Sequence, residues 1–400
     1  MTKIVRIIAR LNVGGPARHV VWLTKELNDA EFKTDLLAGI VPEGEEDMSW
    51  FAEENGVSPI YIEQMSRELS IKDIVSLWKI YRQLKKIKPD IIHTHTAKAG
   101  TIGRIAGFFY RLLNRKKVEI VHTFHGHIFH SYYGNLKTKV FLIIEKTLAQ
   151  FATDKIIVIS RRQFEEIHEE FRIGRKEQFE IIPLGIDLEK FAEAEAKRNI
   201  LREEIGAGAD EILVGFVGRL TEIKNIPLLL KVAKLYLERK KLSFPQVRFI
   251  IIGDGSLRNE LEKEATLYGL QNIVKFLGNR TDADVFYAGL DIVALTSLNE
   301  GTPLSLIEAM ANGKAVISTS VGGVRDLLGE ITAENDGFKV CECGIRTASN
   351  DAEGFYKGLM YLAENINSGL KGKTFVHENY AKERLFKDLK RLYRKLKKSE

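Results

Sequence analysis

Strand and helix patterns alternate along this 400-residue chain in two successive series, and this alternation constrains its fold most. In the first series, strands are expected at 3–10, 34–40, 90–94, 118–123, 155–160 and 179–183, separated by helical patterns such as 16–28, 71–87 and 136–151. In the second, they are expected near 212–217, 247–252, 273–277, 291–296, 315–318 and 337–340. Such alternation is typical of parallel sheets with helices on both faces. With 44% apolar residues, the chain can build two α/β domains, each with its own core.

A polar stretch separates the two series. From Leu188 to Asp210 the chain loses its strand pattern, and Gly206-Ala-Gly208 lies near the end of this stretch. We therefore expect one doubly wound domain at 1–187 and a second at 188–376. The segment 377–400 predicts a helix, and its apolar face consists of Leu385, Phe386, Leu389, Leu392, Tyr393 and Leu396.

The segment Glu300-Gly-Thr-Pro-Leu-Ser-Leu-Ile-Glu308 combines two carboxylates with a helix start. Thr302 is a good N-cap and Pro303 a natural first helical residue, so the amides of Leu304 and Ser305 should point out of a helix N-terminus. Such a terminus suits a phosphate, and a carboxylate can accept hydrogen bonds from sugar hydroxyls. The segment therefore predicts a nucleotide-sugar site. The alternative is an ordinary capped helix with a solvated glutamate at each end.

Glycines mark the ends of several predicted strands. Gly14, Gly218 and Gly253 each follow a strand, and Glu300 follows another. Ligands of parallel sheets bind beyond the carboxyl ends of the strands. We therefore expect these residues to surround one cleft between two facing domains.

The order of these motifs resembles that of the family 4 glycosyltransferases, which have the GT-B fold of two facing Rossmann-like domains. The matching segments are Gly14-Gly15-Pro16, Phe124-His125-Gly126, Ile182-Pro-Leu-Gly-Ile-Asp187, Gly218-Arg219 with Lys224-Asn225, Ile252-Gly-Asp-Gly255, Phe276-Leu-Gly278, Glu300 with Glu308, and Gly322-Gly323. Each motif alone is weak, but their common order over most of the chain is specific. The GT-B fold implies that the last helix crosses back to the first domain. The segment Phe338–Thr347 departs from the family's usual short turn, which leaves its local geometry open.

The resemblance implies a retaining transferase that moves a sugar from a nucleoside diphosphate sugar, most simply a UDP-sugar, to a hydroxyl of a saccharide or lipid-linked acceptor. Cell-surface polysaccharide or glycolipid synthesis is the expected setting. Glu308 would hold the ribose hydroxyls, and Glu300 the transferred sugar. Arg219 and Lys224 would hold the diphosphate, and His125 would orient the sugar or the acceptor. The other expected donor-binding residues are Gly14, Gly15, Gly218, Gly253, Arg280, Gly301, Thr302, Pro303, Leu304 and Ser305.

Histidines are concentrated in one region, where a metal site is the alternative interpretation. Six of the nine lie between 93 and 130. His93 and His95 would share one face of a strand, and His125 and His127 could lie close together. However, no Asp or Glu stands with them, and the His-Glu-x-x-His helical pattern is absent. We therefore expect no metal and no cofactor, with the nucleotide sugar as a substrate.

Two further motifs have metal-site alternatives that we do not favour. Asp282-Ala-Asp284 matches the metal-diphosphate signature of a different glycosyltransferase fold, but Thr281 can cap a helix whose first turn holds both aspartates. Cys341-Glu-Cys343 has spacing too short for a usual zinc knuckle. Two cysteines in the whole chain build no disulfide framework, which fits a reducing cytoplasm.

Basic residues gather in two runs. Residues 371–400 hold eleven Lys or Arg against four acids, and 79–117 hold eleven against Asp90 alone. Solvated helix faces explain such runs, and a peripheral contact with anionic lipid is the alternative, because each basic residue near such a surface contributes about 1 kcal/mol. Nucleic acid is not expected, since no recognition module accompanies the charge.

Two other functions stay open at this point. A GT-B nucleotide-sugar epimerase would share the donor site, and a non-catalytic membrane-binding protein would explain the basic runs. The longest apolar stretches fall far short of the roughly 20 residues that span a bilayer, and the start reads as a buried strand. We therefore expect a cytoplasmic protein, with the inner face of the cell membrane as an alternative position.

Overall fold

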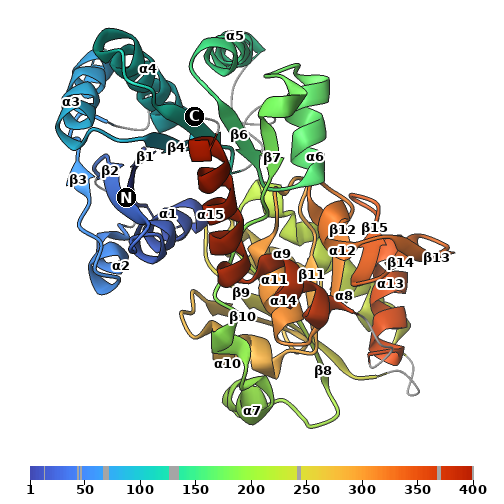
Figure 1. The fold of residues 1–400 in the computed structure, drawn as a ribbon. Helices are drawn as coiled ribbons and strands as arrows, with labels where there is room; N and C mark the ends of the chain where they lie inside the picture. The colour runs from blue at the N-terminus through green and yellow to red at the C-terminus, as the bar shows by residue number, and fades with distance from the viewer. Residues whose placement is uncertain are drawn as a thin grey trace. The chain divides into compact units, whose positions relative to one another are not determined.

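The computed structural model describes residues 1–12, 14–42, 45, 47–65, 72–125, 135–240, 245–366 and 371–398. The chain divides into two compact units (Figure 1). Unit 1 comprises Met1–Gly185 together with Glu383–Glu400, and unit 2 comprises Ile186–Lys382. The C-terminal segment therefore belongs to the same unit as the N-terminus, as the GT-B resemblance implies.

Unit 1 contains a seven-stranded parallel sheet in the order β3-β2-β1-β4-β5-β6-β7. Its strands are β1 (Thr2–Ile8), β2 (Phe32–Ala38), β3 (Ile60–Tyr61), β4 (Ile91–His95), β5 (Glu119–Thr123), β6 (Lys155–Val158) and β7 (Phe179–Ile181). Its helices are α1 (Gly15–Glu26), α2 (Ser49–Glu54), α3 (Lys72–Ile87), α4 (Ala97–Asn114), α5 (Asn135–Phe151), α6 (Arg161–Phe164) and, at the end of the chain, α15 (Lys382–Lys398). The strand order places β1 in the interior of the sheet between β2 and β4, where both faces of the sheet are covered.

Successive residues of β1 face two different helical layers. Val5 and Ile7 pack with the layer of α3 and α4, whereas Ile4 packs with α1 and α15. This follows from the two-residue period of a strand. On α15, the apolar face predicted from the sequence is buried through Leu385, Leu389, Leu392, Tyr393 and Leu396, with Phe386 packed partly against it. The last helix thus completes the core of unit 1.

Unit 2 contains an eight-stranded sheet in the order β10-β9-β8-β11-β12-β15-β14-β13. Its strands are β8 (Ile212–Val217), β9 (Val247–Ile252), β10 (Val274–Gly278), β11 (Ile292–Leu295), β12 (Ala315–Thr319), β13 (Ile331–Asn335), β14 (Phe338–Cys341) and β15 (Gly344–Thr347). Its helices are α7 (Ala194–Ile205), α8 (Ile226–Arg239), α9 (Arg258–Leu267), α10 (Ala283–Gly289), α11 (Leu304–Ala311), α12 (Val324–Leu328), α13 (Ala352–Glu364) and α14 (Gly372–Tyr380). The sheet is parallel except at β14, which pairs antiparallel with β13 and β15.

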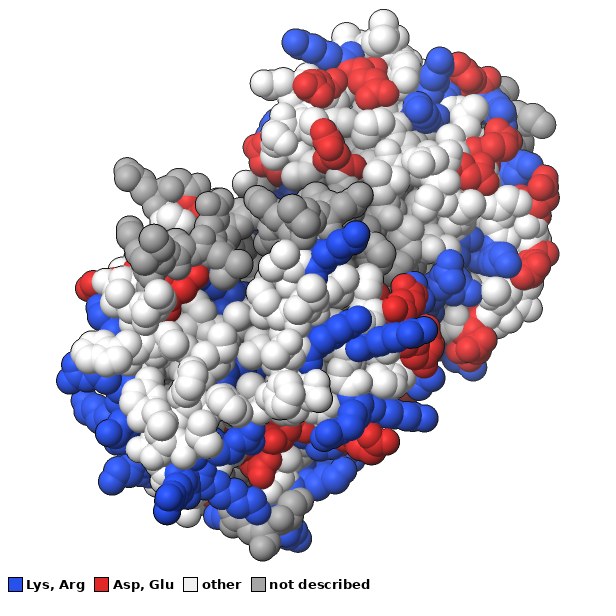
Figure 2. Space-filling view, turned by 90° about the horizontal axis from the view of Figure 1, so that it is seen from above, with Lys and Arg blue, Asp and Glu red and all other residues white. Residues whose placement is uncertain are grey.

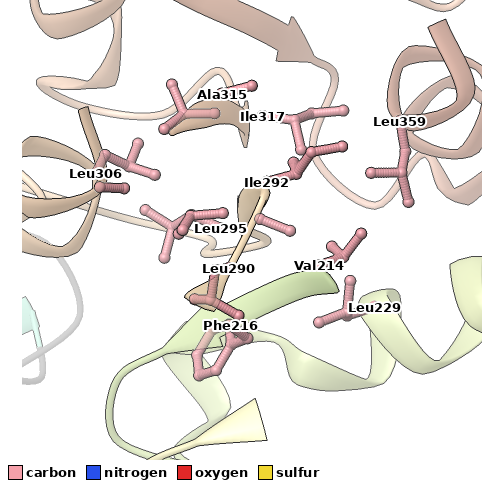
Figure 3. Close-up of a cluster of buried hydrophobic side chains, with 14 of the residues drawn as sticks. Val214, Phe216, Leu229, Leu290, Ile292, Leu295, Leu306, Ala315, Ile317 and Leu359 are labelled. Carbon is pink, nitrogen blue, oxygen red and sulfur yellow. The ribbon is translucent and has the colours of Figure 1, made fainter. Parts of the chain in front are cut away.

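The core of unit 2 anchors the helix that follows the Glu300 loop. Figure 3 shows Leu306 of α11 among buried side chains of the sheet, including Leu295 and Ile292 of β11. Leu306 is completely buried. The start of α11 is therefore held against the sheet edge by apolar packing, independently of any ligand.

The segment Phe338–Thr347, which departs from the family pattern, forms the hairpin of β14 and β15. Cys341 and Cys343 lie in it as buried free thiols. Burial raises the pKa of Cys343 to about 11. Both cysteine side chains pack into the hydrophobic core of unit 2, which anchors the hairpin there.

Candidate functional site

The loops after β8 and β9 approach each other closely in unit 2. A Cβ atom on Gly253 would fall 2.0 Å from the carbonyl oxygen of Gly218, and Gly253 has φ of +131°. Any other residue would collide with backbone there and would also be strained. This contact brings two of the expected glycines together at the carboxyl edge of the sheet.

Lys224 and Glu300 form an ion pair at the same edge. The Nζ atom of Lys224 lies 2.5 Å from Oε1 of Glu300, and the two side chains are 20% and 11% exposed. Ser297 donates to the same carboxylate oxygen over 2.6 Å. A cation and a carboxylate that are 76 positions apart in the sequence are thus in contact at this edge, and both are partly open to solvent.

Backbone contacts hold this ion pair in place. Thr296 donates through Oγ1 to the carbonyl of Lys224 over 2.9 Å, and the amide of Leu298 donates to the carbonyl of Ile223 over 2.8 Å. On the other side, the amide of Gly323 donates to the carbonyl of Glu300 over 3.2 Å. The loops after β8, β11 and β12 are therefore joined around the pair, which makes its geometry preorganised.

The start of α11 differs by one residue from the prediction. Leu304 is the first helical residue and Pro303 the N-cap, whereas Thr302 was expected in that role; the Thr302 hydroxyl is buried without a hydrogen-bond partner. The first helical hydrogen bond runs from the amide of Leu306 to Pro303. The amides of Leu304 and Ser305 precede it, so they are available to an anion, as expected.

Glu308 lies on the second turn of α11 and is 19% exposed. Its Oε1 atom is 3.6 Å from Nζ of Lys190. The pKa of Tyr287 is raised well above its ordinary value, first by burial and second by the negative charge of Glu308. The Tyr287 hydroxyl is therefore protonated beside this carboxylate. Sequence reasoning missed Lys190 and Tyr287, because neither stands in a recognisable motif.

The two expected arginines have different surroundings. Arg219 is exposed and has no ion-pair partner among the described residues, so its guanidinium is available to a ligand. Arg280 is only 15% exposed and pairs with Glu204 and Asp282, each over 2.6 Å. These carboxylates raise the pKa of Arg280, despite its partial burial. Its charge is therefore already balanced inside unit 2, which leaves its expected donor contact without support from the geometry.

The aspartates of the Asp-x-Asp motif are both engaged in ion pairs. Asp282 is the N-cap of α10, the position expected for Thr281, and pairs with Arg280. Asp284 lies 2.7 Å from Nζ of Lys197. These cations hold the pKa of both carboxyls below the usual value. The motif therefore starts a helix and joins it to α7.

In unit 1, His125 belongs to a group of buried imidazoles. Its Nε2 atom lies 3.0 Å from Nδ1 of His95, and its ring lies 4.9 Å from that of His19. Burial lowers the pKa of His125 to about 4, so the ring is neutral near pH 7. His125 is the least buried of the three, and Gly126, His127 and His130 lie outside the described residues.

Gly14 and Gly15 lie where the resemblance places them, at the beginning of α1. Gly14 is the N-cap and Gly15 the first helical residue, with Pro16 in the first turn. No acidic residue stands in that turn. The arrangement leaves backbone amides of α1 available to an anion at the carboxyl edge of the first sheet.

The chemistry of the unit 2 site follows from these positions. One exposed guanidinium, one ammonium and the free amides of α11 can hold a diphosphate. Glu300 lies in the loop before α11, and Glu308 lies on its second turn. The two carboxylates can accept hydrogen bonds from hydroxyls on either side of the diphosphate.

The chain matches two families of known proteins. Residues 13–190 match Glycosyltransferase Family 4, and residues 197–367 match Glycosyl transferases group 1. It is 32% identical over 317 residues to the UDP-Gal:alpha-D-GlcNAc-diphosphoundecaprenol alpha-1,3-galactosyltransferase of Escherichia coli, covering 78% of this chain and 76% of that protein. Over 348 residues it is 27% identical to the capsular polysaccharide biosynthesis glycosyltransferase CapM of Staphylococcus aureus, covering 84% and 85% of the two chains.

Solved structures share the fold over nearly the whole chain. HepE of Anabaena, crystallised with UDP, superposes with a TM-score of 0.79 at 21% identity, covering 98% of this chain and 100% of that one. A glycosyltransferase from Rickettsia africae superposes with a TM-score of 0.76 at 17% identity, covering 100% of both chains. At such identities the likeness shows the fold.

Proposed function

This chain belongs to glycosyltransferase family 4, and we propose that it transfers a sugar from a UDP-sugar to a hydroxyl of a lipid-linked saccharide. Family membership makes it a nucleotide-sugar glycosyltransferase of polysaccharide synthesis with the GT-B fold. The Escherichia coli relative is named for UDP-Gal and for a diphosphoundecaprenol acceptor, which supports this choice of donor and acceptor. The single observation that carries the proposal is the Lys224–Glu300 ion pair beside the open amides of α11.

In this proposal the donor lies along the carboxyl edge of the unit 2 sheet. Arg219 and Lys224 neutralise the diphosphate, together with the amides of Leu304 and Ser305. Glu308 accepts from the ribose hydroxyls, and Glu300 from hydroxyls of the transferred sugar. The burial of Glu300 and its bond from Ser297 support a positioning role, because a held carboxylate orients hydroxyls better than a mobile one.

The catalytic effect of the cations follows from where charge develops. As the leaving group departs, negative charge grows on the β-phosphate while the sugar becomes oxocarbenium-like. Fixed positive groups that contact that phosphate stabilise the transition state more than the ground state. We propose that a phosphate oxygen takes the proton of the acceptor hydroxyl on the same face, which retains the configuration at the anomeric carbon.

We expect transfer to need no added metal, because cations of the protein contact the diphosphate and both aspartates of Asp282-Ala-Asp284 are paired. The measurement incubates the protein with UDP-sugars and a polyprenyl diphosphate saccharide, with EDTA and then with added Mg²⁺ or Mn²⁺. Undiminished transfer in EDTA is the expected result. Activity lost in EDTA and restored by either ion would contradict the metal-free site.

The same assay separates the epimerase alternative. With donor alone, an epimerase would produce an isomerised sugar nucleotide, whereas a transferase leaves the sugar of the donor unchanged. A thermal-shift screen of nucleotide sugars identifies the donor beforehand, because a ligand at 100 times its Kd adds about 2.7 kcal/mol to the free energy of unfolding. No shift with any nucleotide sugar would favour a non-catalytic protein.

A surface of unit 1 supports the proposed contact with a membrane. Helix α3 exposes Ile74, Val75 and Trp78, and α4 exposes Phe109, Leu112 and Leu113. The two helices adjoin, since Asn114 of α4 donates to the hydroxyl of Tyr81 in α3 over 3.3 Å. In the lower left of Figure 2, Lys and Arg side chains outnumber Asp and Glu. Within the described ranges, no helix combines the length and the apolar character required to cross a bilayer.

Reversing Arg115, Lys116 and Lys117 to Glu should weaken binding to anionic vesicles on the order of 100-fold, at about 1 kcal/mol for each lost cation. Arg111 stays unchanged, because it lies 3.0 Å from Asp154 and its loss would disturb the fold. Vesicle co-sedimentation measures the effect, and salt should weaken the wild type similarly.

The matched control for the membrane prediction reverses Lys240, Lys263 and Lys275, three exposed lysines of unit 2, to Glu. It changes net charge equally and should leave vesicle binding nearly unchanged. Equal losses in both triple variants would mean that total charge, rather than this surface, attracts lipid. Unaffected sedimentation in the first variant would leave a soluble acceptor as the better interpretation.

A further inference from the structure

Arg6 lies in the middle of β1 with none of its surface exposed. Among the described residues, none of its three guanidinium nitrogens has a hydrogen-bond partner at ordinary distance and angle. Arg104, equally buried in the same unit, shows the usual solution: its Nη2 atom lies 2.6 Å from Oε1 of Glu145, and its Nε atom donates to the carbonyl of Gly100. A buried arginine without any acceptor is therefore exceptional in this fold and calls for an anion.

Of the groups that the structure describes, Tyr393 influences Arg6 most, and it is no carboxylate. Arg6 pairs in register with His93 of β4, so both side chains leave the sheet on the face covered by α1 and α15. His93 is within 2.6 Å of the Tyr393 hydroxyl and 2.7 Å of the Thr123 hydroxyl. The guanidinium carbon of Arg6 lies 6.0 Å from the centre of the Tyr393 ring. Burial lowers the pKa of Arg6, and Tyr393 only partly offsets this.

Further unpaired nitrogens continue from Arg6 toward the edge of the sheet. The ring of His95 lies 4.2 Å from that of His93, and beyond it stand His19 of α1 and His125. Nδ1 of His19, Nε2 of His95 and Nδ1 of His125 are buried without a hydrogen-bond partner. His125 is partly exposed and therefore gives access to the group from solvent.

We propose that Arg6, His19, His95 and His125 form a binding site for an oxyanion of the phosphate class. The guanidinium supplies the permanent charge, and a neutral His19 can turn an N–H toward the anion. His95 and His125 share one hydrogen bond, so as neutral rings one of the two has a further N–H for the same oxygens. Arginine is well suited to this role, because its planar fork donates two parallel hydrogen bonds to one phosphoryl group. An anion at this position would compensate the guanidinium charge of Arg6 and accept hydrogen bonds from the free N–H groups of the cluster.

A metal ion is the competing occupant, since ligand nitrogens of His19, His95 and His125 all lie within 4.8 Å of one another. The charges favour the anion. After burial, the groups that lower the pKa of His95 are His93, His125, His19 and Arg6, none of them acidic. His19 is influenced likewise, with Arg384 in addition. A divalent cation would add to the uncompensated charge of Arg6, whereas an anion removes it.

Two sources can supply the phosphoryl group: a lipid-linked diphosphate acceptor, or free phosphate. The first rests on the proposed function, and the site itself does not. Its test therefore uses binding rather than turnover as the primary measurement.

The experiment measures thermal unfolding of the full chain by tryptophan fluorescence with inorganic phosphate or pyrophosphate. All three tryptophans, Trp22, Trp50 and Trp78, belong to unit 1, so the signal reports that unit. A Lys224→Ala background weakens anion binding at the unit 2 site. We expect phosphate at about 100 times its Kd to raise the Tm of unit 1 by about 5–10 °C, and Arg6→Met to abolish the rise.

The Tm without phosphate provides a second, opposite expectation. Removing an unpaired buried charge should leave the Tm of Arg6→Met equal to or above that of the parent, whereas removing a structural arginine lowers it. Arg6→Gln provides the same comparison with a polar side chain. The matched control is Arg10→Met, which loses a partly exposed pair with Glu45 on the same segment and should keep the phosphate response.

Three outcomes would overturn the proposal: a full phosphate response in Arg6→Met and Arg6→Gln, a large fall of their Tm without phosphate, or stabilisation of the parent by Zn²⁺ that His95→Gln abolishes. The source is resolved by kinetics of Arg6→Met with Lys224 intact. A raised KM for the lipid-linked acceptor alone assigns the site to the acceptor diphosphate. Unchanged KM values with a lost phosphate response assign it to free phosphate.

Discussion

Replacing Lys224 by alanine is expected to lower kcat by about 100- to 1000-fold, the range for losing one preorganised group that stabilises transition-state charge. The substitution removes the ammonium next to the proposed diphosphate position and also leaves Glu300, 11% exposed, without its counter-ion. That uncompensated carboxylate repels the same phosphate. Steady-state kinetics with saturating donor and acceptor measures the loss.

The control for this prediction is Lys357→Ala, which removes a lysine paired over 2.6 Å with the highly exposed Asp336. It should retain normal turnover. The double variant Lys224→Ala with Glu300→Gln separates the loss of the ammonium from the repulsion by Glu300. In it the neutral amide no longer repels the phosphate, whereas the cation is still absent. Near-normal turnover in Lys224→Ala would refute the proposed diphosphate contact.

Replacing Glu145 by glutamine is expected to destabilise unit 1 by about 3–5 kcal/mol, the usual cost of breaking a buried ion pair. Glu145 and Arg104 are both completely buried, and two hydrogen bonds of 2.6 and 2.7 Å join Nη2 to the carboxylate. Glutamine keeps the size of the side chain but leaves the guanidinium charge uncompensated. Urea unfolding followed by tryptophan fluorescence reports the change, since all tryptophans lie in unit 1.

The exposed pair Lys339–Glu334 provides the comparison for this prediction, because surface pairs contribute little. Glu334→Gln should leave unfolding of unit 1 unchanged. Arg104→Met with Glu145→Leu should recover most of the stability, since apolar residues of similar size often replace a buried pair at no cost. A small effect of Glu145→Gln would mean that water or a rearranged acceptor reaches Arg104.

The sequence predicted the elements whose pattern is local. Buried strands such as β8 and β9 are recognisable in the sequence, because each is an apolar run followed by a glycine. By contrast, β13 is exposed along its whole length and carries no such run, so only its pairing with β14 makes it a strand. The helix face of α15 was readable because its apolar positions recur at helical spacing.

The residues of the candidate site that belong to sequence motifs could be predicted. Those that reach the site only through tertiary contacts could not. Lys224 and Glu300 belong to motifs, and the structure brings them together. Thr302 has a strong local preference for capping, but Pro303 is the N-cap and Leu304 the first helical residue. The loop before this helix packs closely on Gly323, where an added Cβ atom would lie 2.0 Å from the Gly301 carbonyl oxygen. Lys190 approaches Glu308 from a distant turn, and no local signal marks it.

The division of the chain has a consequence for its synthesis on the ribosome. Unit 2 is an insertion, because unit 1 supplies both Met1–Gly185 and Glu383–Glu400. The ends of the insertion are joined by hydrogen bonds from the amide of Ile186 to Tyr380 and from that of Lys382 to Ile186. Unit 2 can therefore close on itself while the ribosome is still at work. Unit 1 cannot complete its core before α15 is synthesised, so a nascent chain exposes the apolar face of its first sheet until then. A truncation before α15 would leave that face accessible to chaperones and proteases.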